Sequence, residues 1–212
     1  MNDPTCQPDP SVDALCLGPE RSSRRLILLH GWGADADDLL DLGAALVDAE
    51  VSVVALRAPQ MHPAGVGRQW YDLQQPQWPG LPAARADLSA RIQALGATVP
   101  FENTALLGFS QGAAMALDVA SELPLAALVA CSGYPHPGWS PKPAVPILLT
   151  HGEQDPVVPF AASEALEEQV RKAGGTVRRV GFAGGHGIDP SVLELIREFL
   201  DAGWRAHDAT AR

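Results

Sequence analysis

The stretch from 106 to 116, LLGFSQGAAMA, decides the fold class. The apolar run TALLGF leads directly into Ser110, and the alanine-rich segment QGAAMALDVA follows it. Gly108 and Gly112 bracket the serine in the pattern G-x-S-x-G. In a nucleophile elbow the serine occupies a strained strand-to-helix turn, and the glycines let strand and helix approach closely. A serine here can also be the N-cap of the helix, so the rest of the chain has to distinguish the two.

Outward from this stretch, short apolar runs alternate with segments of helical period. The apolar runs lie at 25–30, 51–56, 104–109, 125–131, 146–151 and 176–182. The helical patterns lie near 35–47, 83–97, 111–123, 160–173 and 190–204. Continuous apolar runs are typical of parallel strands covered on both faces, and their alternation with helices indicates a doubly wound α/β sheet. We predict a mostly parallel sheet of six strands, with residues 12–17 as a possible seventh strand at its edge.

The length of 212 residues favours one domain over 1–212, with tails at about 1–10 and 205–212. One connection, 58–82, is long, lacks a clear period and is rich in Pro, Gly, Gln and aromatic residues. Such a loop inside a compact domain is usually functional or disordered. Its tryptophans and tyrosine indicate that it is ordered.

Composition excludes several classes of protein. The formal net charge is −10, which disfavours a nucleic-acid partner or a stable association with anionic membranes. Cys6, Cys16 and Cys131 are too few and too scattered for a disulfide framework or a metal cluster. The acidic, proline-containing start does not match a signal peptide, and no apolar run approaches the length of a membrane span. We therefore expect a cytoplasmic protein.

Three residues with complementary chemistry follow three of the predicted strands. Ser110 follows the run at 104–109, Asp155 follows 146–151, and His186 follows 176–182. The carboxyl ends of parallel strands meet at one edge of a sheet, so these side chains are expected to lie together. Their order in the chain, Ser then Asp then His, is the order on α/β-hydrolase sheets. We predict a catalytic triad in which the histidine takes the serine proton and the aspartate stabilises the imidazolium.

Each partner of the serine has a competitor. Glu153 shares the loop of Asp155, which could also simply begin an Asp-Pro turn. His186 is one of six histidines and could belong to a mobile loop, but it alone follows both the serine and a plausible acid. His30 and His151 precede glycine at strand ends and are expected to shape loops. No cluster of histidine, cysteine and carboxylate residues has metal-ligand spacing, so no metal or other cofactor is expected.

The segment HGWG at 30–33 is expected to complete the site. Gly31 and Gly33 allow the backbone to turn a main-chain N–H toward the oxyanion that develops during acyl transfer. The second donor should be the N–H of Gln111, directly after the nucleophile and at the start of its helix.

Together, LLHGWG, QWYDL, LLGFSQGAA, LLTHGEQDPVVP and GGHG resemble the phospholipase/carboxylesterase family of α/β-hydrolases, which includes the acyl-protein thioesterases. The resemblance covers roughly residues 25–200. It implies the triad named above, oxyanion N–H groups on Trp32 and Gln111, and an acyl pocket around Trp70 and Tyr71. Trp78 lies on the same long loop and is expected to affect substrate preference with them.

These observations predict a serine carboxylic-ester hydrolase that forms an acyl-enzyme with small-molecule esters of short to medium chain length. The connection between the strands ending near 131 and beginning near 146 is too short and proline-rich for a helical lid, so we expect an open site without a lid domain. The oligomeric state is expected to be a monomer or homodimer.

Alternative functions stay open. An acyl-protein thioesterase would use the same machinery. By the resemblance, the position of Trp32 is commonly a leucine or another residue in relatives, and Ala113 stands where thioesterase members often have a second glycine. A non-catalytic ligand-binding protein on this scaffold is expected to lack a triad member. A dienelactone-hydrolase-like enzyme is disfavoured because its nucleophile would be cysteine, and this chain has Ser110.

Overall fold

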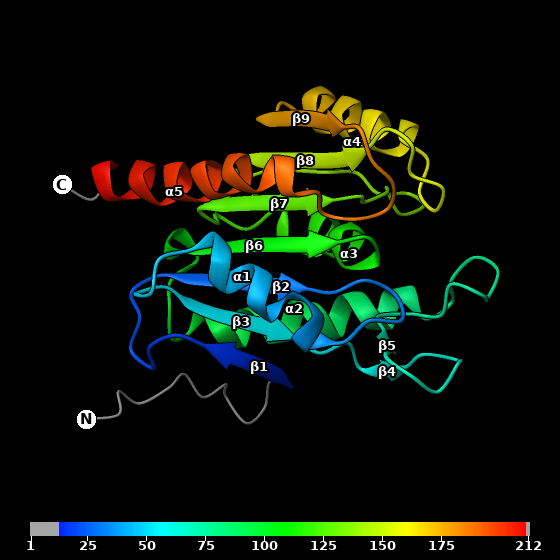
Figure 1. Ribbon diagram of the computed structural model, residues 1–212, viewed down its shortest axis with the longest axis horizontal. Coiled ribbons are helices and arrows are strands. Elements are labelled where there is room, and N and C mark those ends of the chain that lie inside the picture. Colours follow the sequence, from blue (N-terminus) through cyan, green and yellow to red (C-terminus); the bar gives the residue numbers. More distant parts are fainter. Residues whose placement is uncertain (1–12, 211–212) are drawn as a thin grey trace.

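The computed structural model describes residues 13–210 and is built around a seven-stranded sheet (Figure 1). The strand order is β1-β3-β2-β6-β7-β8-β9, and every neighbouring pair is parallel except β1 with β3. The strands are β1 (Ala14–Leu17), β2 (Arg25–Leu29), β3 (Ser52–Leu56), β6 (Thr104–Phe109), β7 (Ala127–Cys131), β8 (Ile147–Gly152) and β9 (Val177–Phe182). The predicted sheet is confirmed, including the seventh strand at its edge.

Helices cover both faces of this sheet (Figure 1). One face carries α1 (Leu40–Leu46) and α5 (Leu193–Thr210), and the other carries α2 (Leu81–Gly96), α3 (Gln111–Ala120) and α4 (Ala161–Lys172). Short 3₁₀ turns, η1 (Ala36–Leu39), η2 (Phe101–Asn103) and η3 (Pro190–Val192), precede α1, β6 and α5.

The continuous apolar runs supply both cores. On β2, Leu26 and Leu28 pack with the helices of one face, whereas Ile27 and Leu29 pack with those of the other. Successive side chains of a strand point to opposite faces, so a strand covered on both sides must be apolar at every position.

The glycines of the elbow allow strand and helix to pass at close range. A Cβ atom on Gly108 would lie 2.5 Å from the carbonyl oxygen of Gly112. A Cβ atom on Gly112 would collide with the carbonyl oxygen of Leu29 on the neighbouring strand. Both positions therefore require glycine for α3 to start against the ends of β2 and β6.

The long connection at 58–82 contains a small antiparallel hairpin that the sequence pattern did not reveal. Its strands, β4 (Gln60–Met61) and β5 (Arg68–Gln69), have two residues each, which is too short for a detectable period. The N–H of Gly33 donates to the carbonyl of Arg68 at 2.8 Å, and the N–H of Arg68 donates to Ala34 at 2.7 Å. The connection is thus hydrogen-bonded to the loop after β2.

The C-terminal part of the chain differs from the prediction of a tail. The predicted tail from 205 is wrong as far as residue 210, because α5 continues to Thr210. The helix is held by the buried side chain of Trp204 and by an ion pair between Arg24 and Asp208 at 2.5 Å. The predicted tail at 1–10 lies outside the described residues. Within 13–210, no helix is both long and apolar enough to cross a membrane.

No lid covers the sheet edge from the connection between β7 and β8. Residues 132–146, all described by the structure, contain turns and extended chain but no helix. This agrees with the predicted absence of a lid.

Candidate active site

Ser110 occupies a strained turn between β6 and α3. Its backbone has φ 54° and ψ −116°, which a residue other than glycine rarely adopts and which costs roughly 1–3 kcal/mol. The N–H of Ser110 donates to the carbonyl of Cys131 at 2.8 Å, and this bond fixes the turn against β7. The serine side chain makes no capping hydrogen bond to α3. Ser110 therefore stands at the N-cap position of α3 without capping the helix through its side chain, and the hydroxyl is free to face another partner.

That partner is His186. Its Nε2 lies 2.9 Å from Ser110 Oγ, and its Nδ1 lies 2.7 Å from Asp155 Oδ2. With Nδ1–H donating to the carboxylate, Nε2 is left to accept the serine proton. The imidazole keeps 17% of its surface exposed, and the carboxylate is fully covered. The ends of β6, β8 and β9 thus bring the three predicted residues together in hydrogen-bonding order.

Asp155 is held by more than the imidazole. Its Oδ1 accepts the N–H groups of Val157 and Val158, both at 2.8 Å. Burial would raise the pKa of the Asp155 carboxyl, but the hydrogen bonds from His186, Val158 and Val157 outweigh it and lower that pKa. The carboxylate of Asp155 therefore has both expected roles: Oδ1 stabilises the Asp-Pro turn, and Oδ2 is the partner of the histidine. Glu153 is exposed.

His30 and His151 shape the loops beside the triad, as predicted. His151 Nε2 lies 2.9 Å from the carbonyl of Val158 and 3.4 Å from Asp155 Oδ2, so it supports the acid loop. His30 Nε2 accepts the N–H of Ala58 at 3.0 Å, which leaves Nδ1–H to donate to the carbonyl of Gly31 at 2.8 Å. Burial lowers the pKa of His30, so the ring stays neutral in this arrangement.

Trp32 lies on the loop after β2, and Gln111, which directly follows the serine, is the first residue of α3. Within residues 13–210, neither main-chain N–H donates a hydrogen bond to the protein. The Trp32 indole N–H donates to Gln69 Oε1 at 2.8 Å, and its ring meets the ring of His62 edge to face at 4.1 Å. Gly33 follows with φ 81°, a value that suits glycine. The Trp32 side chain is therefore fixed by the long connection.

Comparison with known proteins identifies the family of this chain. The family model described as Phospholipase/Carboxylesterase matches residues 16–203. The chain belongs to the phospholipase/carboxylesterase family. Esterase YpfH of Escherichia coli K12, a relative, is 31% identical over 204 residues, which cover 86% of this chain and 84% of the relative. Acyl-protein thioesterase 1 of Neurospora crassa is 28% identical over 116 residues, 48% of this chain and 46% of that protein.

Solved structures show the same α/β-hydrolase fold. The crystal structure of esterase PE8 has a TM-score of 0.82 and 30% identity, covering 90% of this chain and 98% of that one. The Bacillus cereus carboxylesterase has a TM-score of 0.79, with 92% of this chain and 96% of that chain covered, at 24% identity. At that identity the likeness concerns the fold alone.

The three aromatic residues expected to contact substrate have different surroundings in this member of the phospholipase/carboxylesterase family. The side chains of Trp70 and Tyr71 are completely buried in the core. They present no surface to a substrate, so the prediction of direct contact is wrong for these two. Trp78 is half-buried, and its ring lies 5.4 Å from that of Tyr71 and 5.8 Å from that of Tyr134.

A second aspartate–histidine pair lies beneath these aromatic residues. His136 Nδ1 lies 2.6 Å from Asp118 Oδ2, and His136 Nε2 lies 2.8 Å from the hydroxyl of Tyr71. Arg85 Nε donates to the same carboxylate oxygen, and the Tyr134 hydroxyl lies 2.7 Å from that of Tyr71. Sequence reasoning missed this network, because nothing local to His136 indicates a partner on α3.

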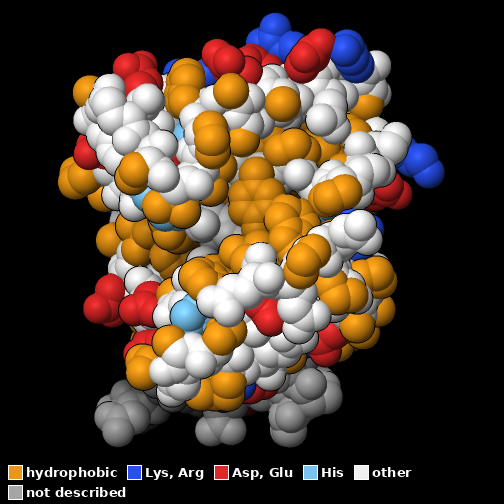
Figure 2. Space-filling view, turned by 90° about the vertical axis from the view of Figure 1, so that its right-hand side faces the viewer, with side chains coloured by type: hydrophobic (Ala, Val, Ile, Leu, Met, Phe, Trp, Pro, Cys, Tyr) orange, Lys and Arg blue, Asp and Glu red, His pale blue; other side chains and the backbone are white. Residues whose placement is uncertain are grey.

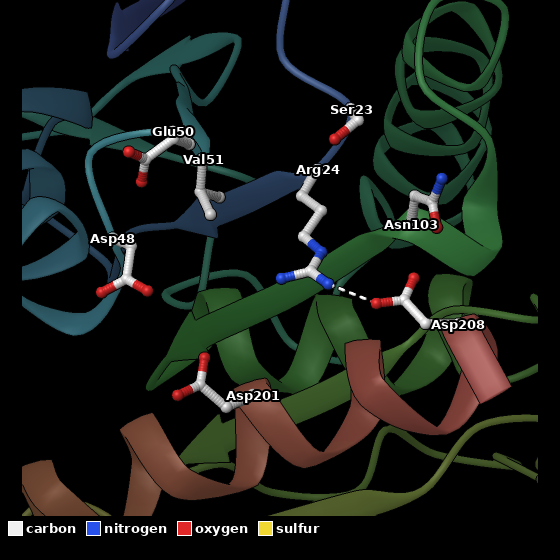
Figure 3. Close-up of a pocket in the computed structure, with 8 residues that line it drawn as sticks. All are labelled: Ser23, Arg24, Asp48, Glu50, Val51, Asn103, Asp201 and Asp208. Atoms are coloured by element: carbon white, nitrogen blue, oxygen red, sulfur yellow. Dashed lines mark hydrogen bonds and ion pairs between the residues drawn. The ribbon is translucent and has the colours of Figure 1, made fainter.

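There are cavities both at the amino ends and at the carboxyl ends of the strands. A cavity of about 360 Å³ is lined by Ser23, Arg24, Asp48, Glu50, Val51, Asn103, Asp201 and Asp208 (Figure 3). Several of these residues precede strands, so this acidic cavity lies at the amino ends, far from the triad. A cavity of about 240 Å³ borders the triad histidine and is lined by Phe182, Gly185, His186, Gly187, Ile188, Asp189 and Pro190.

Hydrophobic side chains gather on the face that contains the carboxyl ends of the strands. Figure 2 shows them in the middle of this face, where the surface is hollowed, with charged side chains placed mainly around the rim. Such a surface suits an acyl chain better than a charged ligand.

Proposed function

We propose that this protein is a serine carboxylesterase that hydrolyses small-molecule esters through an acyl-enzyme on Ser110. One observation carries the proposal: the hydroxyl of a strained serine, a histidine and a buried carboxylate are joined at 2.9 and 2.7 Å. Membership of the phospholipase/carboxylesterase family supports the same reaction class.

The proposed reaction follows from the donors and acceptors in the site. Ser110 Oγ attacks the acyl carbon while His186 Nε2 takes the hydroxyl proton, and Asp155 stabilises the imidazolium. The N–H groups of Trp32 and Gln111 donate to the oxyanion of the tetrahedral intermediate. Nε2 then returns the proton to the leaving alcohol. A water molecule repeats the path, giving the carboxylic acid and the free serine.

Short- to medium-chain esters are the proposed substrates. The hydrophobic hollow on the face of the strand ends supports an acyl group, and the connection from β7 to β8 adds no lid (Figure 2). Gln77 and Trp78 both adopt positive φ, 62° and 48°, which is strained for residues other than glycine. This strain supports a role for the half-buried Trp78 ring in contact with the acyl chain.

Thioester hydrolysis is the second candidate, because some relatives are named acyl-protein thioesterases. The same serine, histidine and oxyanion donors would serve a thiol leaving group. The proposed preference is for the oxygen ester.

The test compares oxygen esters of increasing acyl length, together with an oxygen ester and a thioester of one acyl chain. We expect turnover of the esters and covalent labelling by a fluorophosphonate probe. In Ser110→Ala, kcat should fall by about 10⁴-fold or more while the protein stays folded. Full labelling of the alanine variant would contradict the nucleophile assignment. A higher kcat/KM on the thioester would favour the second candidate.

A further inference from the structure

The side chain of Gln111 has a role separate from its main-chain N–H. It is completely buried, and both ends of its amide are hydrogen-bonded to the long connection. Oε1 accepts the N–H of Trp70 at 3.0 Å, and Nε2 donates to the carbonyl of Tyr71 at 2.8 Å. A buried amide without partners would be costly, so this pairing fixes the start of α3 against residues 70 and 71.

The same short segment is bonded to the loop after β2. The indole N–H of Trp70 donates to the carbonyl of His30 at 2.9 Å. The side-chain oxygen of Gln69 accepts the indole N–H of Trp32 at 2.8 Å. Segment 69–71 therefore lies between the loop at 30–33 and the start of α3, which carry the proposed oxyanion donors, and it is hydrogen-bonded to both.

The loop at 30–33 is also hydrogen-bonded to residues that precede this segment. His30 is held by the N–H of Ala58, and the N–H of Gly33 donates to the carbonyl of Arg68. The pairing of β2 with β6 places the start of this loop beside the elbow, and the position of its remaining residues relative to α3 depends on how segment 69–71 meets α3. The Gln111 amide makes that junction.

We propose that the Gln111 side chain is a positioning residue that sets the spacing between its own main-chain N–H and that of Trp32. This inference rests on the proposed esterase function. The side chain itself touches no substrate and acts through segment 69–71. Oxyanion donors are effective only when they are preorganised, and a displacement of about 1 Å can cost on the order of 10²-fold in rate.

The test is Gln111→Met, which keeps the main-chain N–H and nearly the same volume but removes both amide hydrogen bonds. We expect kcat on a short-chain ester to fall about 10- to 100-fold with KM nearly unchanged, because the loss concerns the transition state. Affinity for a trifluoromethyl ketone of the same acyl length should fall in parallel with kcat/KM, since its adduct carries the oxyanion. Gln74→Met, which changes an exposed glutamine of the same connection, is the matched control and should keep the activity of the unmodified chain.

The outcomes separate this inference from the proposed function. Gln111→Met with unchanged kcat and inhibitor affinity, even with a lowered Tm, overturns the positioning role and leaves the esterase intact. Absence of ester hydrolysis by the unmodified chain overturns both. If Gln111→Met does not fold, Trp70→Phe is the second variant; it removes the bond to the His30 carbonyl at the other end of the bridge, together with part of a fully buried ring. A loss of about 10-fold in kcat is then expected, and an unchanged kcat overturns the proposal.

Discussion

Two regions of this molecule contain the same chain of hydrogen bonds. In the candidate active site, Asp155, His186 and Ser110 are joined at 2.7 and 2.9 Å. In the core beneath the long connection, Asp118, His136 and Tyr71 are joined at 2.6 and 2.8 Å. In both, the carboxylate meets Nδ1 and a hydroxyl meets Nε2.

The surroundings of the two chains differ. Ser110 keeps 8% of its surface exposed, and the side chain of His186 keeps 17%. A substrate can therefore reach both residues. Tyr71 and the side chain of His136 have no exposed surface. Burial is the main cause that raises the pKa of Tyr71, which keeps the phenol protonated.

The hydroxyls also differ in what they face. Ser110 stands on a strained turn with two N–H groups nearby that have no protein partner within the described chain. The Tyr71 hydroxyl instead faces that of Tyr134, whose pKa burial raises to about 12. The comparison indicates that this connectivity alone does not distinguish a candidate nucleophile from a structural hydroxyl: at Ser110 it is combined with access, a strained backbone and nearby N–H groups without a protein partner in the part of the chain that the structure describes.

The largest expected difference in kcat is between variants of the two aspartates, Asp155 and Asp118. Asp155→Asn should lower kcat by about 10⁴-fold, because it stabilises the wrong imidazole tautomer. Asp118→Asn should keep kcat within a few fold but lower the free energy of unfolding by roughly 1–3 kcal/mol, because buried donors lose a charged acceptor. Ester turnover and urea unfolding of both variants check this.

Glu153→Gln is the control for the acid, since this exposed carboxylate shares the loop of Asp155. It should leave kcat unchanged. A large loss in Glu153→Gln, or a larger loss in Asp118→Asn than in Asp155→Asn, would mean that the wrong carboxylate has been assigned to the triad.

Trp78→Ala tests whether the aromatic cluster above the buried pair contacts substrate. The half-buried ring packs near Tyr71, Tyr134 and His136. We expect kcat/KM to fall about 10-fold on medium-chain esters and to change little on an acetyl ester, because apolar contacts contribute roughly 1–3 kcal/mol. Equal losses at all chain lengths, together with a lowered Tm, would instead make Trp78 a structural cover.

Tyr71→Phe removes the hydroxyl of the buried chain and is the counterpart of Ser110→Ala. It should cost about 1–2 kcal/mol of stability, from the lost hydrogen bonds to Tyr134 and His136. The rate of fluorophosphonate labelling should stay within a few fold of that of the unmodified chain. Complete loss of labelling in a folded Tyr71→Phe protein would break the distinction between the two regions.

The smallest expected effect is on the pH dependence of stability. The pKa of Asp155 is lowered below its ordinary value of 3.8, so the folded state binds fewer protons there than the unfolded state. The stabilisation is present above that ordinary value and is lost as the pH falls through the folded-state pKa. Asp155→Asn should therefore lose less free energy of unfolding between pH 5 and pH 3 than the unmodified chain, as measured by urea titration. An equal or steeper loss in the variant would contradict the lowered pKa.

Local pattern was sufficient for most of the fold and for the candidate triad. Most strands outside the small hairpin are apolar runs, although β9 contains Arg178 and Arg179, and each triad residue follows a strand within four residues, so strand ends could be ordered from the chain alone. The elbow could be recognised because Gly108 and Gly112 permit a close approach that larger residues forbid. The strands, the residues that follow them and the elbow can each be identified from residues that are close together in the sequence.

The remaining features depend on contacts between distant segments. Asp155 rather than Glu153 faces His186, because the turn after β8 directs only one of them toward the β9 loop. The burial of Trp70 and Tyr71 depends on the packing of the long connection over α3. The sheet, the elbow and the order of the triad follow from residue type and spacing along the chain. Which hydroxyl is accessible and which is enclosed follows from tertiary packing, because access depends on the segments that pack around each hydroxyl.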